Sequence, residues 1–156
     1  MREPITNKGL ESLKEELERL KRVERPNVIE AIAEARGHGD LSENAEYDAA
    51  KEKQGMIEGR IRELDHLIAT AEVIDVSTLS GDRVTFGATV QLVDLDSDKE
   101  ATYQIVGVAE TDLEQGRISV RSPMARALIG KSVGDEVTLV APGGTREFEI
   151  QEVAFH

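Results

Sequence analysis

The sequence predicts an α+β protein of two domains, an N-terminal antiparallel two-helix coiled coil and a C-terminal small domain with an antiparallel sheet. Two observations lead to this prediction. Apolar residues recur at helical spacing through the first part of the chain, whereas Gly, Val and Thr become frequent after residue 80. We expect the boundary near Val76–Gly81, where serine, threonine and glycine are typical of a linker. The expected domains are therefore residues 1–76 and 77–156.

The first expected helix carries a single apolar stripe. Its leucines recur at steps of 3, 4 and 3 residues, the spacing of a coiled-coil seam: Leu10, Leu13, Leu17 and Leu20. Thr6 or Asn7 can cap its start. Because an interior proline removes a backbone hydrogen bond and kinks a helix, Pro26 predicts a bend near Arg25. The glycines of residues 37–39 indicate where this helix ends.

A second helix is expected from residues 40–43 to about Ala71. Its apolar residues recur at steps of 4, 3, 4 and 3 in its second half: Ile57, Ile61, Leu64, Ile68 and Ala71. Two such helices joined by a loop of a few residues must be antiparallel neighbours. Each has roughly 30 residues, which predicts a rod about 45 Å long.

The second half of the chain predicts five strands and a short helix. The strands are expected where apolar and polar residues alternate between turn signals: Thr89–Leu95, Ala101–Val108, Arg117–Val120, Glu136–Val140 and Arg146–Val153. The first two flank a polar turn and should form a hairpin. After the third strand, Ser122, Pro123 and Gly130 stand where the cap, the first residue and the end of a short helix belong.

The composition excludes several classes of function. With 31 Asp+Glu and 19 Lys+Arg, the net charge is −12, so strong binding of free duplex DNA is not expected. The sequence has no cysteine, which excludes disulfides, thiolate metal ligands and a cysteine nucleophile. No apolar run approaches the roughly 20 residues of a membrane span, and no signal peptide is visible. We therefore expect a cytoplasmic protein without a membrane partner.

The segment between the two helices carries the most informative side chains. Asp40, Glu43 and Glu46 are spaced three residues apart, so two of these carboxylates could contact one cation from the same helix face. The same spacing is typical of a helix cap, and the spacing by itself favours the cap. Three basic residues flank the segment, either as a phosphate-facing patch or as solvated charges: Arg36, Lys51 and Lys53.

The sequence contains no motif of a complete active site. It has no GxxxxGK[ST] phosphate loop and no metal-ligand spacing among its three histidines. Two carboxylates alone make a poor Mg²⁺ site, because Mg²⁺ keeps its waters and needs further ligands. We therefore expect that the chain is not an enzyme by itself and that its acidic segment could complete a site on another protein.

Several segments resemble the Gre transcript-cleavage factors of bacterial RNA polymerase. The resemblance covers nearly the whole chain, and its most specific parts are IEAIAEARGHGDLSEN at residues 29–44 and SPMARALIGK at residues 122–131. The modest basic content around the acidic segment makes the chain more similar to the A branch of that family than to its more basic B branch.

The resemblance implies a mechanism at the acidic segment. The coiled coil would enter the secondary channel of RNA polymerase and stimulate cleavage of backtracked nascent RNA. Asp40 and Glu43 would help hold a second Mg²⁺ and position a water, and the ion would be shared with the polymerase. No tight Mg²⁺ site is expected in the free protein. Arg36 and Lys51 would face the RNA near its 3′ end.

The resemblance also implies that the C-terminal domain is FKBP-like and docks on the polymerase through Ser122 and Pro123. Three other functions remain open at this point. The chain could be an inhibitor that binds the same channel, a coiled-coil interaction module, or a prolyl isomerase. The last is disfavoured by the 3% aromatic content, which leaves little to line a proline pocket.

Overall fold

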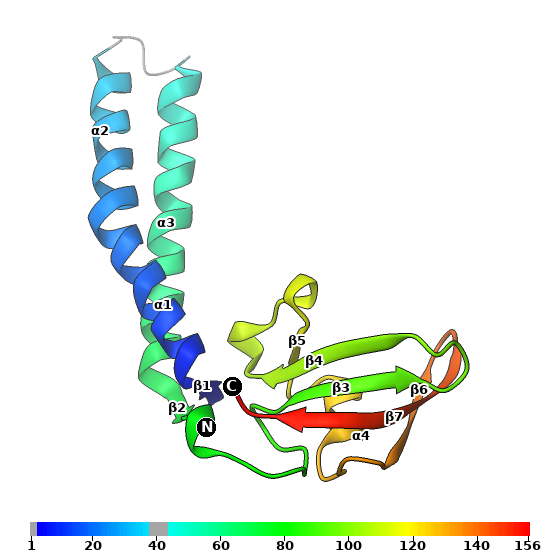
Figure 1. The fold of residues 1–156 in the computed structure, drawn as a ribbon. Coiled ribbons are helices and arrows are strands. Elements are labelled where there is room, and N and C mark those ends of the chain that lie inside the picture. The colour runs from blue at the N-terminus through cyan, green and yellow to red at the C-terminus, as the bar shows by residue number, and fades with distance from the viewer. Residues whose placement is uncertain (1–2, 38–43) are drawn as a thin grey trace. The chain divides into compact units, whose positions relative to one another are not determined.

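The computed structural model describes residues 3–37 and 44–156, and Figure 1 shows the order of their elements. The chain divides into two compact units, a helical unit of Leu10–Thr70 and a β unit of Met1–Gly9 with Ala71–His156. The sequence predicts a single boundary near Val76–Gly81. In the structure the chain passes between the units twice, after Gly9 and after Thr70, because the start of the chain packs within the β unit.

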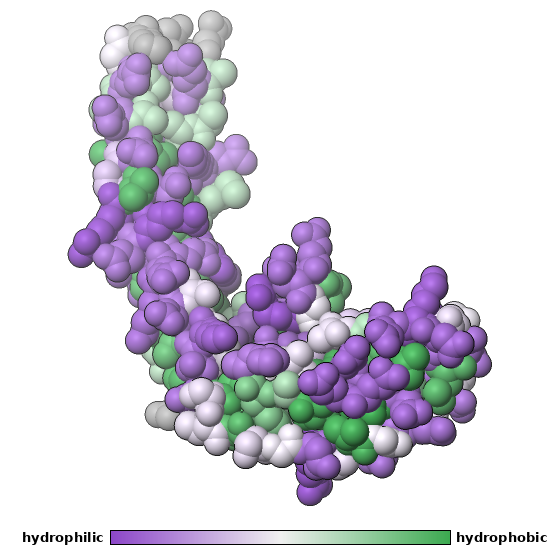
Figure 2. Space-filling model, viewed as in Figure 1, coloured by the Kyte–Doolittle hydropathy of each residue, from purple (hydrophilic) through white to green (hydrophobic). Residues whose placement is uncertain are grey.

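The helical unit is the expected antiparallel hairpin. It consists of α1 (Asn7–Arg19), a π-helical turn (Leu20–Glu24), α2 (Arg25–Arg36) and α3 (Ala45–Thr70). Five of its buried side chains belong to the two predicted seams: Leu13, Leu20, Ile57, Ile61 and Leu64. The other buried side chains of the hairpin are Val28, Ile32, Ala35 and Ala50. Figure 2 shows hydrophilic side chains over much of the outer surface of this hairpin. The hairpin therefore depends on one narrow apolar interface.

The irregularity expected near Arg25 is present as the π-helical turn. The backbone N–H of Arg25 donates to the carbonyl of Leu20, five residues earlier. Pro26 follows in the first turn of α2; it has no N–H, and its ring crowds the carbonyl four residues before it. A single wider turn is a common way for a helix to accommodate such an interruption. Figure 1 shows the helix changing direction between α1 and α2.

Polar side chains cap the starts of α1 and α3. Thr6 caps α1, as predicted, with its Oγ1 accepting from the N–H of Gly9 at 3.0 Å. Asn44 caps α3, with its Oδ1 accepting from the N–H of Tyr47 at 3.0 Å. The predicted start of this helix at residues 40–43 lies outside the described residues. At the end of α2, the N–H of Gly37 donates to the carbonyl of Glu34 at 3.0 Å.

The β unit contains all five predicted strands. They are β3 (Thr89–Asp94), β4 (Glu100–Val106), β5 (Arg117–Ser119), β6 (Glu136–Ala141) and β7 (Gly144–Ala154), in the order β5-β4-β3-β7-β6. The prediction of an antiparallel sheet was wrong at one edge, because β5 pairs with β4 in parallel. The chain passes from β4 to β5 through two short 3₁₀ turns, Val108–Glu110 and Leu113–Gln115. Because of this connection, β5 runs in the same direction as β4.

The predicted short helix, α4 (Pro123–Leu128), contributes to the core of the β unit. Its buried residues Ala125 and Leu128 belong to the same apolar cluster as the inner side chains of the sheet. That cluster also contains Val84, Ala88, Val90, Leu92, Ile105, Ile118, Val137, Phe148 and Ile150. Alternation along β3, where every second residue is buried, follows from the two-residue period of a strand.

A second, two-stranded sheet was not predicted. In it β1 (Glu3–Thr6) pairs in parallel with β2 (Ala71–Ile74), and Pro4 lies opposite Glu72. Each strand has four residues, too few for a periodic pattern to be recognised. This pairing joins the chain just before α1 to the chain just after α3.

Candidate functional site

The closed end of the hairpin is defined here as Ala35, Arg36, Asn44, Tyr47 and Lys51. The side chain of Asn44 joins its two helices. Its Oδ1 accepts from the N–H of Tyr47 at the start of α3. Its Nδ2 donates to the carbonyl of Ala35 in the last turn of α2 at 2.6 Å. One amide therefore bonds to both helices, and it joins the two points from which the chain between them continues.

The two predicted basic residues are both exposed on this end of the hairpin. The guanidinium carbon of Arg36 lies 5.8 Å from the centre of the Tyr47 ring, within the range of a cation–π contact. The Nζ of Lys51 lies 3.2 Å from Oε1 of Gln54 on the same helix. Both side chains are exposed and carry a positive charge.

Asp40 and Glu43, the predicted metal and water ligands, lie outside the described residues. Within residues 3–37 and 44–156, no group of three or more His, Asp or Glu side chains is placed to hold a metal ion. Over the same ranges, no helix combines the length and the apolar character required to cross a bilayer. The predicted Mg²⁺ site concerns the residues between α2 and α3, and it stays a prediction.

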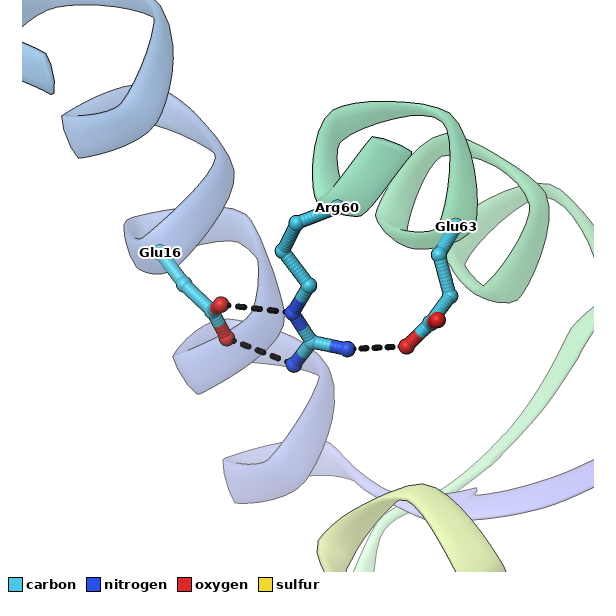
Figure 3. Close-up of polar contacts among 3 residues, drawn as sticks. All are labelled: Glu16, Arg60 and Glu63. Carbon is cyan, nitrogen blue, oxygen red and sulfur yellow. Dashed lines mark hydrogen bonds and ion pairs between the residues drawn. The ribbon is translucent and has the colours of Figure 1, made fainter. Parts of the chain in front are cut away.

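Two bidentate ion pairs link the helices further along the hairpin. Figure 3 shows Arg60 of α3 donating from Nε and Nη2 to the carboxylate of Glu16 on α1, at 2.7 and 2.9 Å, while its Nη1 contacts Glu63. Arg25 of α2 donates in the same way to Glu58 of α3, at 2.8 and 2.7 Å. These hydrogen bonds lower the pKa of the Glu16 and Glu58 carboxyls. Each pair restricts how one helix can slide along the other.

Ser122 and Pro123, the predicted docking residues, begin α4. The Oγ of Ser122 accepts from the N–H of Ala125 at 3.2 Å, and Pro123 is the exposed first residue of the helix. The hydroxyl of Ser122 is thus engaged in capping. Pro123 is the member of the pair whose side chain is available to a partner.

No pattern in the sequence indicated a role for Glu110, which organises the start of the chain within the β unit. Its carboxylate accepts from the backbone N–H of Thr6 at 3.0 Å, from the N–H of Gly107 at 2.8 Å and from the hydroxyl of Thr6. Thr6 in turn caps α1. No local sequence signal predicts a contact between residues 104 positions apart.

The sequence also did not indicate Asn44 as the cap of α3. Asp40, with Glu43 three residues later, matches the pattern of a helix cap and favoured an earlier start of the helix.

Two family models match the chain. The model described as transcription elongation factor, N-terminal, covers residues 3–73, and the model described as transcription elongation factor GreA/GreB, C-terminal, covers residues 79–155. Together they span both the hairpin and the five-stranded sheet.

Several relatives match over nearly their full length. The transcription elongation factor GreA of Anaeromyxobacter sp. is 64% identical over 154 residues, which are 99% of this chain and 93% of the relative. That of Acidiphilium cryptum is 62% identical over 152 residues, 97% of each chain. A solved structure of GreA factor homolog 1 from Thermus thermophilus is 29% identical, covers 99% of each chain and has a TM-score of 0.46. The chain belongs to the GreA/GreB family of transcription elongation factors.

Proposed function

We propose that this transcription elongation factor binds cytoplasmic RNA polymerase and stimulates the polymerase's own cleavage of backtracked nascent RNA. The observation that carries the proposal is the family membership, with relatives above 60% identity over almost the whole chain. The hairpin supports it as well, because two long antiparallel helices can reach a buried active site and deliver side chains there. The catalytic machinery remains that of the polymerase, and this chain acts as its cofactor.

The residues between the helices suit the metal that the proposal requires. Asp40 and Glu43 carry carboxylate oxygens, the hard donors that Mg²⁺ prefers, and Mg²⁺ commonly binds through one or two carboxylates together with phosphates and water. The remaining ligands would come from the polymerase and the RNA. When bound, the second metal of such a site stabilises the attacking and leaving oxygens of phosphodiester hydrolysis. Asp40 and Glu43 would hold this ion and orient the attacking water.

The basic residues at the closed end would act on the RNA itself. Arg36 and Lys51 carry exposed cations on the two helices that enter and leave the acidic segment. The RNA phosphates are the anions that such cations bind. Arg36 can donate bidentate hydrogen bonds to a phosphate, whereas the Lys51 ammonium acts as a point charge. Together they would hold the displaced 3′ end of the RNA while the acidic residues act on the scissile phosphate.

The C-terminal sheet would dock on the rim of the polymerase channel through the start of α4. Pro123 is exposed there, and Ser122 keeps the helix start in place. We expect Pro123→Ala to weaken binding to RNA polymerase without altering the stability of the β unit, whereas Ser122→Ala should lower that stability by about 1 kcal/mol through loss of the cap. Equal binding of wild type and Pro123→Ala would place the docking surface elsewhere.

A cleavage assay tests the main proposal. A backtracked elongation complex with end-labelled RNA is incubated with Mg²⁺, with and without the protein, beside the Asp40→Ala/Glu43→Ala double variant. We expect the wild type to shorten the RNA, and the double variant to bind the polymerase without doing so. If the wild type binds but leaves the RNA intact or slows nucleotide addition, the protein is instead an inhibitor that occupies the channel.

A further inference from the structure

Asn44 makes two hydrogen bonds that require the same orientation of its side-chain amide. The oxygen must face the N–H of Tyr47, 3.0 Å away, and the nitrogen must face the carbonyl of Ala35, 2.6 Å away. An amide has one acceptor end and one donor end, so a flipped amide would lose both bonds together. The two hydrogen bonds therefore hold the Asn44 amide in one orientation.

Few other side chains can make this pair of contacts. The first N–H groups and the last carbonyls of a helix have no partner within their own helix. Asn44 supplies an acceptor to the start of α3 and a donor to the end of α2. Aspartate would keep the acceptor but has no donor, and its second oxygen would face the Ala35 carbonyl. A serine hydroxyl is a single atom and cannot occupy both positions.

The atoms that Asn44 joins are next to the cation that the proposed function places against RNA. Ala35 directly precedes Arg36, and Tyr47 is the residue whose ring lies under the Arg36 guanidinium. We propose that Asn44 is a positioning residue, which holds the ends of α2 and α3 so that Arg36 stays over the Tyr47 ring. Its effect on RNA cleavage rests on the proposed function, but its effect on Tyr47 does not.

The first test measures the tyrosine environment in the free protein. The sequence has two tyrosines and no tryptophan, so Tyr103→Phe leaves Tyr47 as the remaining tyrosine. In that background we expect Asn44→Asp and Asn44→Ser to lose most of the near-ultraviolet circular dichroism of tyrosine, which reports fixed aromatic packing. Far-ultraviolet dichroism should be unchanged, because both variants keep a capping oxygen. An unchanged tyrosine signal in both variants would overturn the proposal.

The second test separates positioning from binding in the cleavage assay. Asn44→Asp and the uncharged Asn44→Ser should each lower the maximal cleavage rate by about tenfold or more, since small misplacements of positioned groups cost that much. The protein concentration that gives half the maximal rate should stay within about twofold, because docking uses other surfaces. Glu58→Gln is the matched control, because it removes the Arg25 ion pair within the same hairpin, away from its closed end.

The outcomes distinguish this inference from the proposed function. A wild type without cleavage activity would contradict the proposed function, and the Tyr47 signal would still decide the role of Asn44. Full cleavage by both Asn44 variants would overturn the inference while the proposed function stood. A loss in Glu58→Gln as large as that in the Asn44 variants would also overturn it, because general weakening of the hairpin would then be the cause.

Discussion

Asp94 is a buried carboxylate at the turn that joins β3 to β4. It accepts from the backbone N–H groups of Asp96 at 2.9 Å and Ser97 at 3.2 Å, and Arg146 lies 3.6 Å from its other oxygen. These two backbone hydrogen bonds are the main reason that the pKa of Asp94 is lowered from its ordinary value. The ionised form is thus part of the folded turn.

This lowered pKa predicts how the stability of the β unit depends on pH. The carboxylate's contribution is fully present above its unfolded pKa of about 4 and is lost as the pH falls through the lower pKa of the folded state. We therefore expect Asp94→Asn to flatten the fall in unfolding free energy below about pH 4, measured by urea titration at several pH values. Asp82→Asn, at an exposed position, controls for the loss of one charge, and equal slopes in the two variants would contradict the prediction.

At the scale of the elements, two helical glycines should respond in opposite directions to alanine. A Cβ at Gly55 in α3 would meet no atom within 4 Å, whereas a Cβ at Gly9 in α1 would collide with the carboxylate of Glu110. Gly55→Ala should therefore raise stability by about 0.5–1 kcal/mol through backbone entropy. Gly9→Ala should lower stability despite the same gain in helix propensity. Thermal melting followed by circular dichroism measures both, and a gain in Gly9→Ala would show that Glu110 can move aside.

The ion pairs that join the helices should differ in strength according to their geometry. Arg60 and Glu16 form two hydrogen bonds, whereas Lys21 and Asp65 meet only at 3.9 Å and are about half exposed. A double-mutant cycle on the first pair should give a coupling of about 0.5–1 kcal/mol, reduced by added salt. The second pair should give a coupling near zero. Equal coupling in both cycles would mean that the bidentate geometry adds nothing.

At the scale of the whole molecule, the two compact units should unfold as separate transitions. Leu64 is fully buried in the hairpin and Phe148 lies in the core of the β unit. Leu64→Ala should remove about 2–5 kcal/mol from the hairpin alone, and Phe148→Ala about 3–5 kcal/mol from the β unit alone. Calorimetry of the two variants should therefore move different transitions. One transition that both substitutions shift would show that the units unfold together.

Much of the architecture could be predicted from local patterns in the chain. Helical periodicity indicated both arms of the hairpin, and the position of Pro26 indicated the irregularity that appears as a π-helical turn. Alternation indicated the five strands, and Ser122 with Pro123 indicated α4. Each of these features depends on residues close together in the sequence, so that backbone propensity and the burial of one face are enough to determine it.

The candidate site was only partly predictable. The sequence pointed to Arg36 and Lys51, and the structure places both as exposed cations on the closed end of the hairpin. It did not point to Asn44, because a capping residue is recognised from its own helix, whereas the second bond of Asn44 goes to the other helix. The roles of Asp40 and Glu43 stay predictions for the cleavage assay to decide.

The sequence by itself determined the helices, the strands of the five-stranded sheet, the apolar seams and the family. Only the tertiary structure decided the parallel pairing of β1 with β2, the parallel edge strand β5 and the contacts of Glu110 and Asn44. Those features join segments that are distant in the chain or belong to different helices. They are stabilised by hydrogen bonds to backbone groups that have no local partner. The folded arrangement decides which distant group forms each of these hydrogen bonds.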